Sequence, residues 1–167
     1  MRVNEPMSII TSEKVFLSYC HEDEWLKDEL IQTLDPLVRN NSIEIWHDRL
    51  IKVGSDFDAE IKSRLDSSDI MILLVSPAFV ASSYCVDVEF QFAKNKFASD
   101  EMKIVPILVR ECTIEVAGLQ DFQIIPPDLN PVNGKGVSRI EREKRDHLWK
   151  VVFDQIKNIT EAQKKTL

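Results

Sequence analysis

The chain has 167 residues, 44% of them hydrophobic, so it is the size of one domain and can bury a core without disulfides or metal. Its 21 Lys and Arg residues against 28 Asp and Glu residues give a net charge of −7, the wrong sign for holding a nucleic-acid backbone. The spacing of Cys20, Cys85 and Cys112 favours reduced thiols over a disulfide framework or a zinc site. No run is apolar for long enough to span a bilayer or form a signal peptide. We therefore expect a cytoplasmic domain with no metal, no nucleic acid and no membrane partner.

Five short apolar runs predict the strands of a sheet. They cover Val15 to Leu17, Ile43 to Trp46, Ile70 to Val75, Ile104 to Val109 and, more weakly, Phe122 to Ile125. The third and fourth runs are almost continuously apolar, which is typical of central parallel strands that are covered on both faces.

Between these runs the hydrophobic period changes to that of an amphipathic helix. The apolar helical positions are Leu26, Leu30, Leu34 and Leu37, then Phe57, Ile61 and Leu65, and finally Leu148, Val152 and Ile156. Start signals are acidic residues 22–24 in a first turn, Ser55 with Asp58 as a capping box, and Ser76 as an N-cap before Pro77. The alternation predicts an α/β domain with a doubly wound, parallel, five-stranded sheet. We expect the larger aromatic side chains in its core: Trp46, Phe90, Phe92, Phe97 and Trp149.

Ligands of such sheets bind beyond the carboxyl ends of the strands, where the strand order reverses beside the first strand. The loops to consider are therefore residues 18–23, 46–55 and 76–83. None carries a standard nucleotide motif, and Gly134-Lys135-Gly136 is followed by Arg139 where a dinucleotide fingerprint needs a small residue. No G-x-S-x-G nucleophile elbow is present either.

Glu89 is a carboxylate where an amphipathic helix should be apolar. In a helix from Tyr84 to Phe97, the residues three and four positions from Glu89 are Cys85, Val86, Phe92 and Ala93, with no Lys or Arg among them. A carboxylate among apolar groups loses solvation, which proteins rarely tolerate without a use for the group. The alternative is a structural glutamate at the edge of the stripe, with its tip in water.

Several segments, read in order, resemble a TIR (Toll/interleukin-1 receptor/resistance) domain of the bacterial type. They are Val15 to Tyr19, Ile45 to Arg49 with Gly54 following, Leu74 to Pro77, and Tyr84 to Glu89, and the match continues through Val105 to Arg110 and Trp149. This divides the chain into an N-terminal extension (1–13), a TIR domain (14–159) and a connector or tail (160–167).

The resemblance implies a flavodoxin-like fold and, as in many bacterial and plant relatives, cleavage of NAD⁺ between nicotinamide and ribose. The family's catalytic carboxylate is a glutamate on the helix after the third strand, which Glu89 matches. NAD⁺ is then the substrate, and no cofactor is implied. Many active relatives have a Trp four positions before the glutamate, where this chain has Cys85, with Tyr84 beside it.

By position in the family's motifs, nine residues are implied to contact NAD⁺: Ser18, Tyr19, Cys20, His21, Asp48, Arg49, Ser76, Tyr84 and Cys85. For two of these residues, the sequence alone also allows a structural role that needs no NAD⁺. Arg49 can pair with a surface acid instead, and Ser76 is most simply a helix cap.

Assembly is the other property that the resemblance implies. Ile51, Val53 and Gly54 lie in a loop whose counterpart packs against a neighbouring protomer, so the active species is expected to be an oligomer or filament. The expected function is an NAD⁺ hydrolase of bacterial antiphage defence that releases nicotinamide and ADP-ribose, with a fused or associated sensor. The alternatives are a cyclase that makes a cyclic ADP-ribose signal and a non-catalytic adaptor that only assembles.

Overall fold

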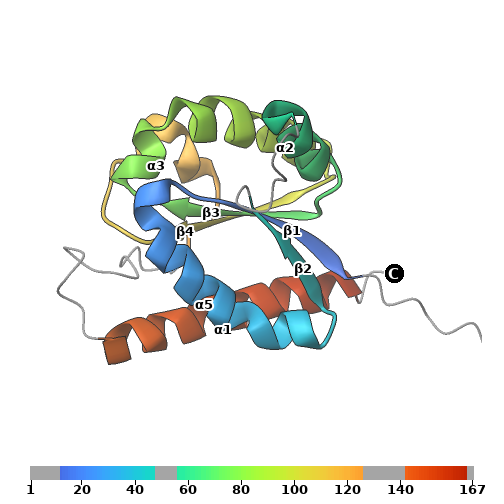
Figure 1. Ribbon diagram of the computed structural model, residues 1–167, viewed down its shortest axis with the longest axis vertical. Helices are drawn as coiled ribbons and strands as arrows, with labels where there is room; N and C mark the ends of the chain where they lie inside the picture. The colour runs from blue at the N-terminus through green and yellow to red at the C-terminus, as the bar shows by residue number, and fades with distance from the viewer. Residues whose placement is uncertain (1–11, 48–55, 126–141, 165–167) are drawn as a thin grey trace, which may run out of the picture.

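A computed structural model of the protein describes residues 12–47, 56–125 and 142–164 (Figure 1). Its centre is a parallel sheet of β1 (Glu13–Ser18), β2 (Ile43–Trp46), β3 (Ile70–Val75) and β4 (Lys103–Leu108) in the order β2-β1-β3-β4. The α/β class and the parallel doubly wound sheet are therefore confirmed, and the strand count of five is wrong for the described residues.

The fifth expected strand is reduced to a single bridge. Ile125 pairs with Ile107 of β4, and the two backbone hydrogen bonds of this contact join Ile125 to Pro106 and Leu108 at 2.9 Å each. Pro126 and Pro127 follow directly, and proline has no N–H to donate to a longer ladder.

Helices cover both faces of the sheet (Figure 1). The helix α1 (Glu24–Arg39), which follows the 3₁₀ turn η1 (His21–Asp23), packs with α5 (Arg142–Lys164) on one face. On the other face lie α2 (Phe57–Asp66), α3 (Pro77–Ala81), the π-helical segment η3 (Tyr84–Phe90) and α4 (Gln91–Ala98). Two short 3₁₀ turns, η4 (Ile114–Ala117) and η5 (Leu119–Asp121), follow β4.

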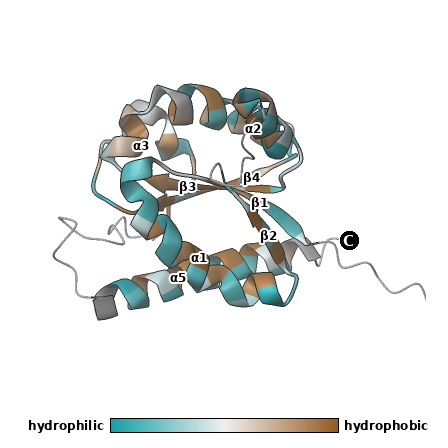
Figure 2. Cartoon of the chain, in the orientation of Figure 1, coloured by the Kyte–Doolittle hydropathy of each residue, from teal (hydrophilic) through white to brown (hydrophobic). Residues whose placement is uncertain are grey.

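The core therefore has two halves, one on each face of the sheet, and β1 contributes to both. Val15 and Leu17 pack against α1 and α5, whereas Phe16 packs against the helices of the other face. Figure 2 shows the strands as largely hydrophobic, as expected for a sheet covered on both sides. Because side chains alternate along a strand, Ser18 points to the same face as Phe16, and this alternation aims it at η3.

The helix boundaries follow local signals, with one correction. Ser76 caps α3 as expected, because its Oγ accepts a hydrogen bond from the Phe79 N–H at 3.1 Å. The cap of α2 is Asp56, which accepts from the Ala59 N–H at 3.2 Å, rather than Ser55, which lies outside the described residues. The last helix, α5, runs through Lys164 and therefore includes residues 160–164 of the expected connector; the division into domains stays a prediction. No helix in the described ranges is long and apolar enough to cross a bilayer.

Candidate functional site

The strand order reverses between β1 and β3, because the chain leaves β1 for β2 and then crosses back to β3. This reversal is the position at which parallel α/β sheets bind ligands, beyond the carboxyl ends of the strands. Ser18 is the last residue of β1 and Ser76 follows β3 directly. The chain then runs through α3 into η3, which carries Glu89 back to the end of β1.

Glu89 is buried at this edge, with 5% of its surface exposed. Its Oε2 accepts a hydrogen bond from Ser18 Oγ at 2.6 Å, a short distance of the kind seen when the acceptor is charged. The prediction that Glu89 points into an apolar layer is confirmed. The alternative, a glutamate whose tip reaches water, is wrong for this structure.

The segment that holds Glu89 is a π-helix rather than the expected α-helix. Its seven residues are followed without a break by α4. Cys85 and Glu89 are buried, whereas Asp87 and Val88 are exposed. Single π-helical turns are rare and occur frequently at functional sites. The segment therefore adds a second, independent reason to place the site here.

Cys85 forms a wall of the same site. Its side chain is buried, and its Sγ lies 4.0 Å from the backbone oxygen of Tyr19. Burial, and then the nearby charge of Glu89, raises the pKa of the Cys85 thiol to about 12. The group is therefore a neutral thiol near pH 7 and not a nucleophile, because the thiolate is the reactive form.

Asp23 is the residue that sequence reasoning missed. We expected Asp23 only as negative charge in a first helical turn, but Asp23 is fully buried and accepts hydrogen bonds from Ser76 Oγ and from Arg110 Nε, the latter at 3.0 Å. Arg110 also lies 3.8 Å from Glu22. Asp23 thus joins the segments that follow β1, β3 and β4. The one available signal was Arg110 itself, a cation directly after the apolar run of β4.

The Tyr19 ring packs on the opposite face of the sheet from Glu89, with the core residues of α1 and α5. Lys27 Nζ lies 5.5 Å from its centroid, and the rings of His21 and His47 lie edge-on at 6.4 and 6.1 Å. Lys27 itself is buried and paired with Asp28 at 2.6 Å. Only the backbone of Tyr19 therefore reaches the Glu89 side of the sheet.

The structure thus brings together part of the expected site. Ser18, Cys85 and Glu89 are in one place, with half-buried Cys20 close by. Ser76 is fully buried with its hydroxyl bonded within the protein, so its position supports capping rather than contact with NAD⁺. His21 is exposed on η1. The remaining expected positions lie outside the described residues: Asp48, Arg49, Ile51, Val53, Gly54 and the side chain of Tyr84. All contacts with NAD⁺ stay predictions.

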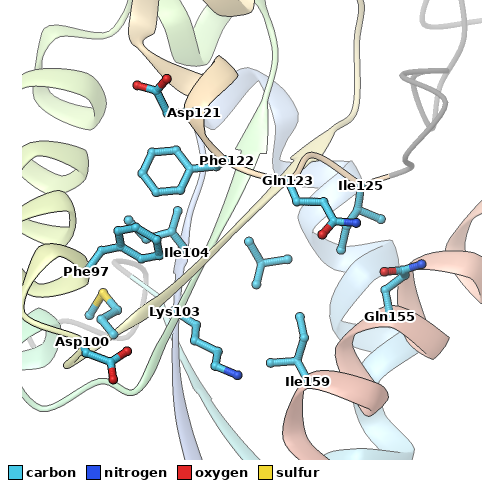
Figure 3. A pocket seen from close by; sticks show the side chains of 12 residues that line it. Phe97, Asp100, Lys103, Ile104, Asp121, Phe122, Gln123, Ile125, Gln155 and Ile159 are labelled. Carbon is cyan, nitrogen blue, oxygen red and sulfur yellow. The ribbon is translucent and has the colours of Figure 1, made fainter. Parts of the chain in front are cut away.

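A separate cavity of about 370 Å³ lies beside β4, between α4 and α5 (Figure 3). Phe97, Lys103, Phe122 and Gln155 are among its lining residues, and none of the expected site residues lines it. We therefore do not assign the candidate site to this cavity.

Comparison with protein families identifies the class of domain. A family model described as a TIR domain matches residues 15–148. The chain therefore belongs to the TIR domain family.

Two curated relatives match parts of the chain. The uncharacterized protein y4lF of Sinorhizobium fredii (strain NBRC 101917 / NGR234) is 41% identical over 118 residues, which are 71% of this chain and 36% of y4lF. The 2′ cyclic ADP-D-ribose synthase BtTIR of Bacteroides thetaiotaomicron is 31% identical over 70 residues, which are 41% of this chain and 23% of BtTIR. The chain thus spans about a third or less of the length of each relative.

Two solved structures share the fold. The TIR domain of the Toll-related receptor TRR-2 from Hydra magnipapillata has a TM-score of 0.53 and 23% identity, covering 86% of this chain and 97% of that one. The TIR domains of the activated Roq1 resistosome, which directly recognizes the pathogen effector XopQ, have a TM-score of 0.51 and 19% identity, covering 84% and 83%. At these identities the likeness concerns the fold alone.

Proposed function

We propose that this TIR domain cleaves NAD⁺ between nicotinamide and ribose, with Glu89 as the catalytic carboxylate. The observation that carries the proposal is the buried Glu89 carboxylate, held by Ser18 at the point where the strand order reverses. A buried carboxylate is costly, and such groups cluster at functional sites. Membership of the TIR family, in which BtTIR is named a synthase of a cyclic ADP-ribose, supports the same chemistry.

A site with one carboxylate suits this reaction. Cleavage of the bond between ribose and nicotinamide passes through an oxocarbenium-like ribose, as in glycoside hydrolysis. Nicotinamide leaves as a neutral molecule from a cationic ring, so the reaction needs no general acid. Glu89, fixed in an apolar layer, would stabilise the positive charge as it develops and accept hydrogen bonds from the ribose hydroxyls.

Water and adenine then compete for the ribose cation. Attack by water gives ADP-ribose, whereas cyclisation requires the adenine to be held near the reacting carbon. Cys85 stands where many relatives have an aromatic wall, so we propose an open pocket with ADP-ribose as the main product. The alternative, a cyclic product, is favoured by one specific observation, the 31% identity with BtTIR.

The experiment incubates concentrated protein with NAD⁺ and separates the products by chromatography. We expect NAD⁺ to disappear with equal amounts of nicotinamide and ADP-ribose. A dominant cyclic ADP-ribose isomer would overturn the product assignment and leave Glu89 in its role. Absence of nicotinamide at every protein concentration would favour the adaptor, which acts by assembly alone.

The wider role is proposed in the same way. Because the chain spans a minor part of its curated relatives, we propose that it acts with a fused or associated sensor and is activated by self-association. Antiphage defence in a bacterial cytoplasm is the proposed setting. The NAD⁺ assay repeated with the full-length protein and candidate second messengers tests the sensor, because activation should appear only with the correct messenger.

A further inference from the structure

Ser18 and Glu89 form a buried pair between two distant parts of the chain. Ser18 is 2% exposed and ends a central strand, and Glu89 is 5% exposed and sits on η3, 71 residues later. The distance of 2.6 Å between Ser18 Oγ and Glu89 Oε2 is at the short end for a hydroxyl donating to a carboxylate. The more rigid partner is Ser18, because its strand pairs with β2 on one side and β3 on the other.

The single hydroxyl proton of Ser18 is donated to Glu89, so it is not available to a ligand. The hydroxyl also lies against the Cys85 thiol, which fills another side of the group. The way in which this hydroxyl can act on the reaction as a donor is therefore through the carboxylate that accepts its proton.

We propose that Ser18 is a positioning residue whose hydroxyl aims the Glu89 carboxylate and keeps it ionised for the reaction. The proposal rests on the proposed NAD⁺ cleavage and gives Ser18 a different role from the substrate contact that the family resemblance implied. The physical reason is that a hydrogen bond donated to a carboxylate stabilises its charged form, and more strongly where water is excluded. Without that hydrogen bond, the charged form of Glu89 is less stabilised, and Glu89 takes up a proton at a higher pH.

The other titratable groups near Glu89 are the same in wild type and in the Ser18 variants, so they cannot cause a difference between these proteins. On η3 these are Cys85, whose thiol is neutral near pH 7, and exposed Asp87. The segment after β1 brings Cys20 and His21, and beyond Ser76 lies the pair of Asp23 with Arg110. A difference between Ser18 variants therefore reports the removed hydroxyl.

The kinetic test compares Ser18→Ala, Ser18→Thr and wild type in NAD⁺ cleavage over the acid pH range. Threonine keeps the hydroxyl and suits a strand. Ser68→Ala is the matched control, because Ser68 is also buried but its hydroxyl donates to the Arg64 carbonyl at the end of α2. For Ser18→Ala, we expect a lower kcat with little change in KM, and an acid limb displaced upward by about one to two pH units. Ser18→Thr should restore the limb, and Ser68→Ala should keep the wild-type profile.

A titration without substrate separates this proposal from the proposed function. The Glu89 side-chain carboxyl is followed by ¹³C NMR, with Glu89→Gln used to assign its signal. We expect a higher titration midpoint in Ser18→Ala than in wild type or Ser18→Thr. An unchanged or lower midpoint overturns the role of Ser18, whether or not NAD⁺ is cleaved. If the midpoint is raised in Ser18→Ala but the wild type never cleaves NAD⁺, the positioning role of Ser18 is supported and the proposed function is refuted.

Discussion

Asp23→Ala is expected to lower the free energy of unfolding by about 3 kcal/mol. Two losses contribute to this value: the ion pair with Arg110 and the hydrogen bond from Ser76. Removing one partner of a fully buried ion pair costs about 3–5 kcal/mol. Here the Arg110 side chain is 21% exposed and has Glu22 nearby, so part of its charge can return to water and the cost is smaller. Fully buried Ser76 also loses the acceptor for its hydroxyl, which adds about 1–3 kcal/mol.

Urea denaturation of Asp23→Ala, Arg110→Ala and the double variant measures these terms. We expect a coupling energy of about 1–2 kcal/mol between Asp23 and Arg110, because each single change leaves the other group without a partner. Asp154→Ala is the control, since the side chains of Asp154 and its partner Lys150 are 52% and 67% exposed although their ion pair is only 2.7 Å long. That change should cost about 1 kcal/mol or less. If Asp23→Ala costs no more than Asp154→Ala, the role of Asp23 in joining three strand ends is refuted.

Three further predictions concern pH, assembly and the pocket wall. The pKa of the Cys85 thiol is raised from 9.0 to about 12, so the contribution of the neutral thiol to stability is complete below pH 9 and is lost as the pH rises toward 12. In thermal unfolding, the melting temperature of wild type should therefore fall relative to that of Cys85→Ala between pH 9 and pH 12. Parallel curves of melting temperature against pH for the two proteins would contradict this. Ile51→Asp or Val53→Asp should reduce both sedimentation of assemblies and specific activity, and loss of activity with assembly unchanged would separate the two. Tyr84→Ala should lower the turnover of NAD⁺ in a product assay, and an unaltered rate would remove Tyr84 from the pocket.

The strands and the position of Glu89 were predictable because they depend on local pattern. Continuous apolar runs such as Ile70–Val75 can only be buried on both faces, and the alternation in β1 then fixes the direction of Ser18. Trp46, Phe90 and Trp149 are buried as expected. Phe97, expected in the core, is 47% exposed: it lies in the last turn of α4, where its ring packs edge-on against Phe122 and lines the cavity beside β4.

The remaining features depend on contacts between distant residues. Arg110 is 87 positions from Asp23, and no periodicity links the two, so the buried network behind the site was invisible in the sequence. Similarly, the spacing of Cys85 and Glu89 fits an α-helix, and only the backbone of the folded chain shows the wider π-helical turn. The fifth strand was predicted from a weak apolar pattern, and the structure has only a single bridge there, between Ile125 and Ile107.

The most direct measurement of the central claim is NAD⁺ cleavage by Glu89→Gln, with Asp87→Asn as the matched control. Both changes replace a carboxylate by an amide on the same π-helical segment, but Asp87 is exposed and Glu89 is buried against Ser18. We expect Glu89→Gln to release no nicotinamide while its melting temperature is unchanged or higher, because a desolvated charge has been removed, and Asp87→Asn to retain wild-type turnover. Near-wild-type turnover by a folded Glu89→Gln protein would show that Glu89 is not the catalytic carboxylate.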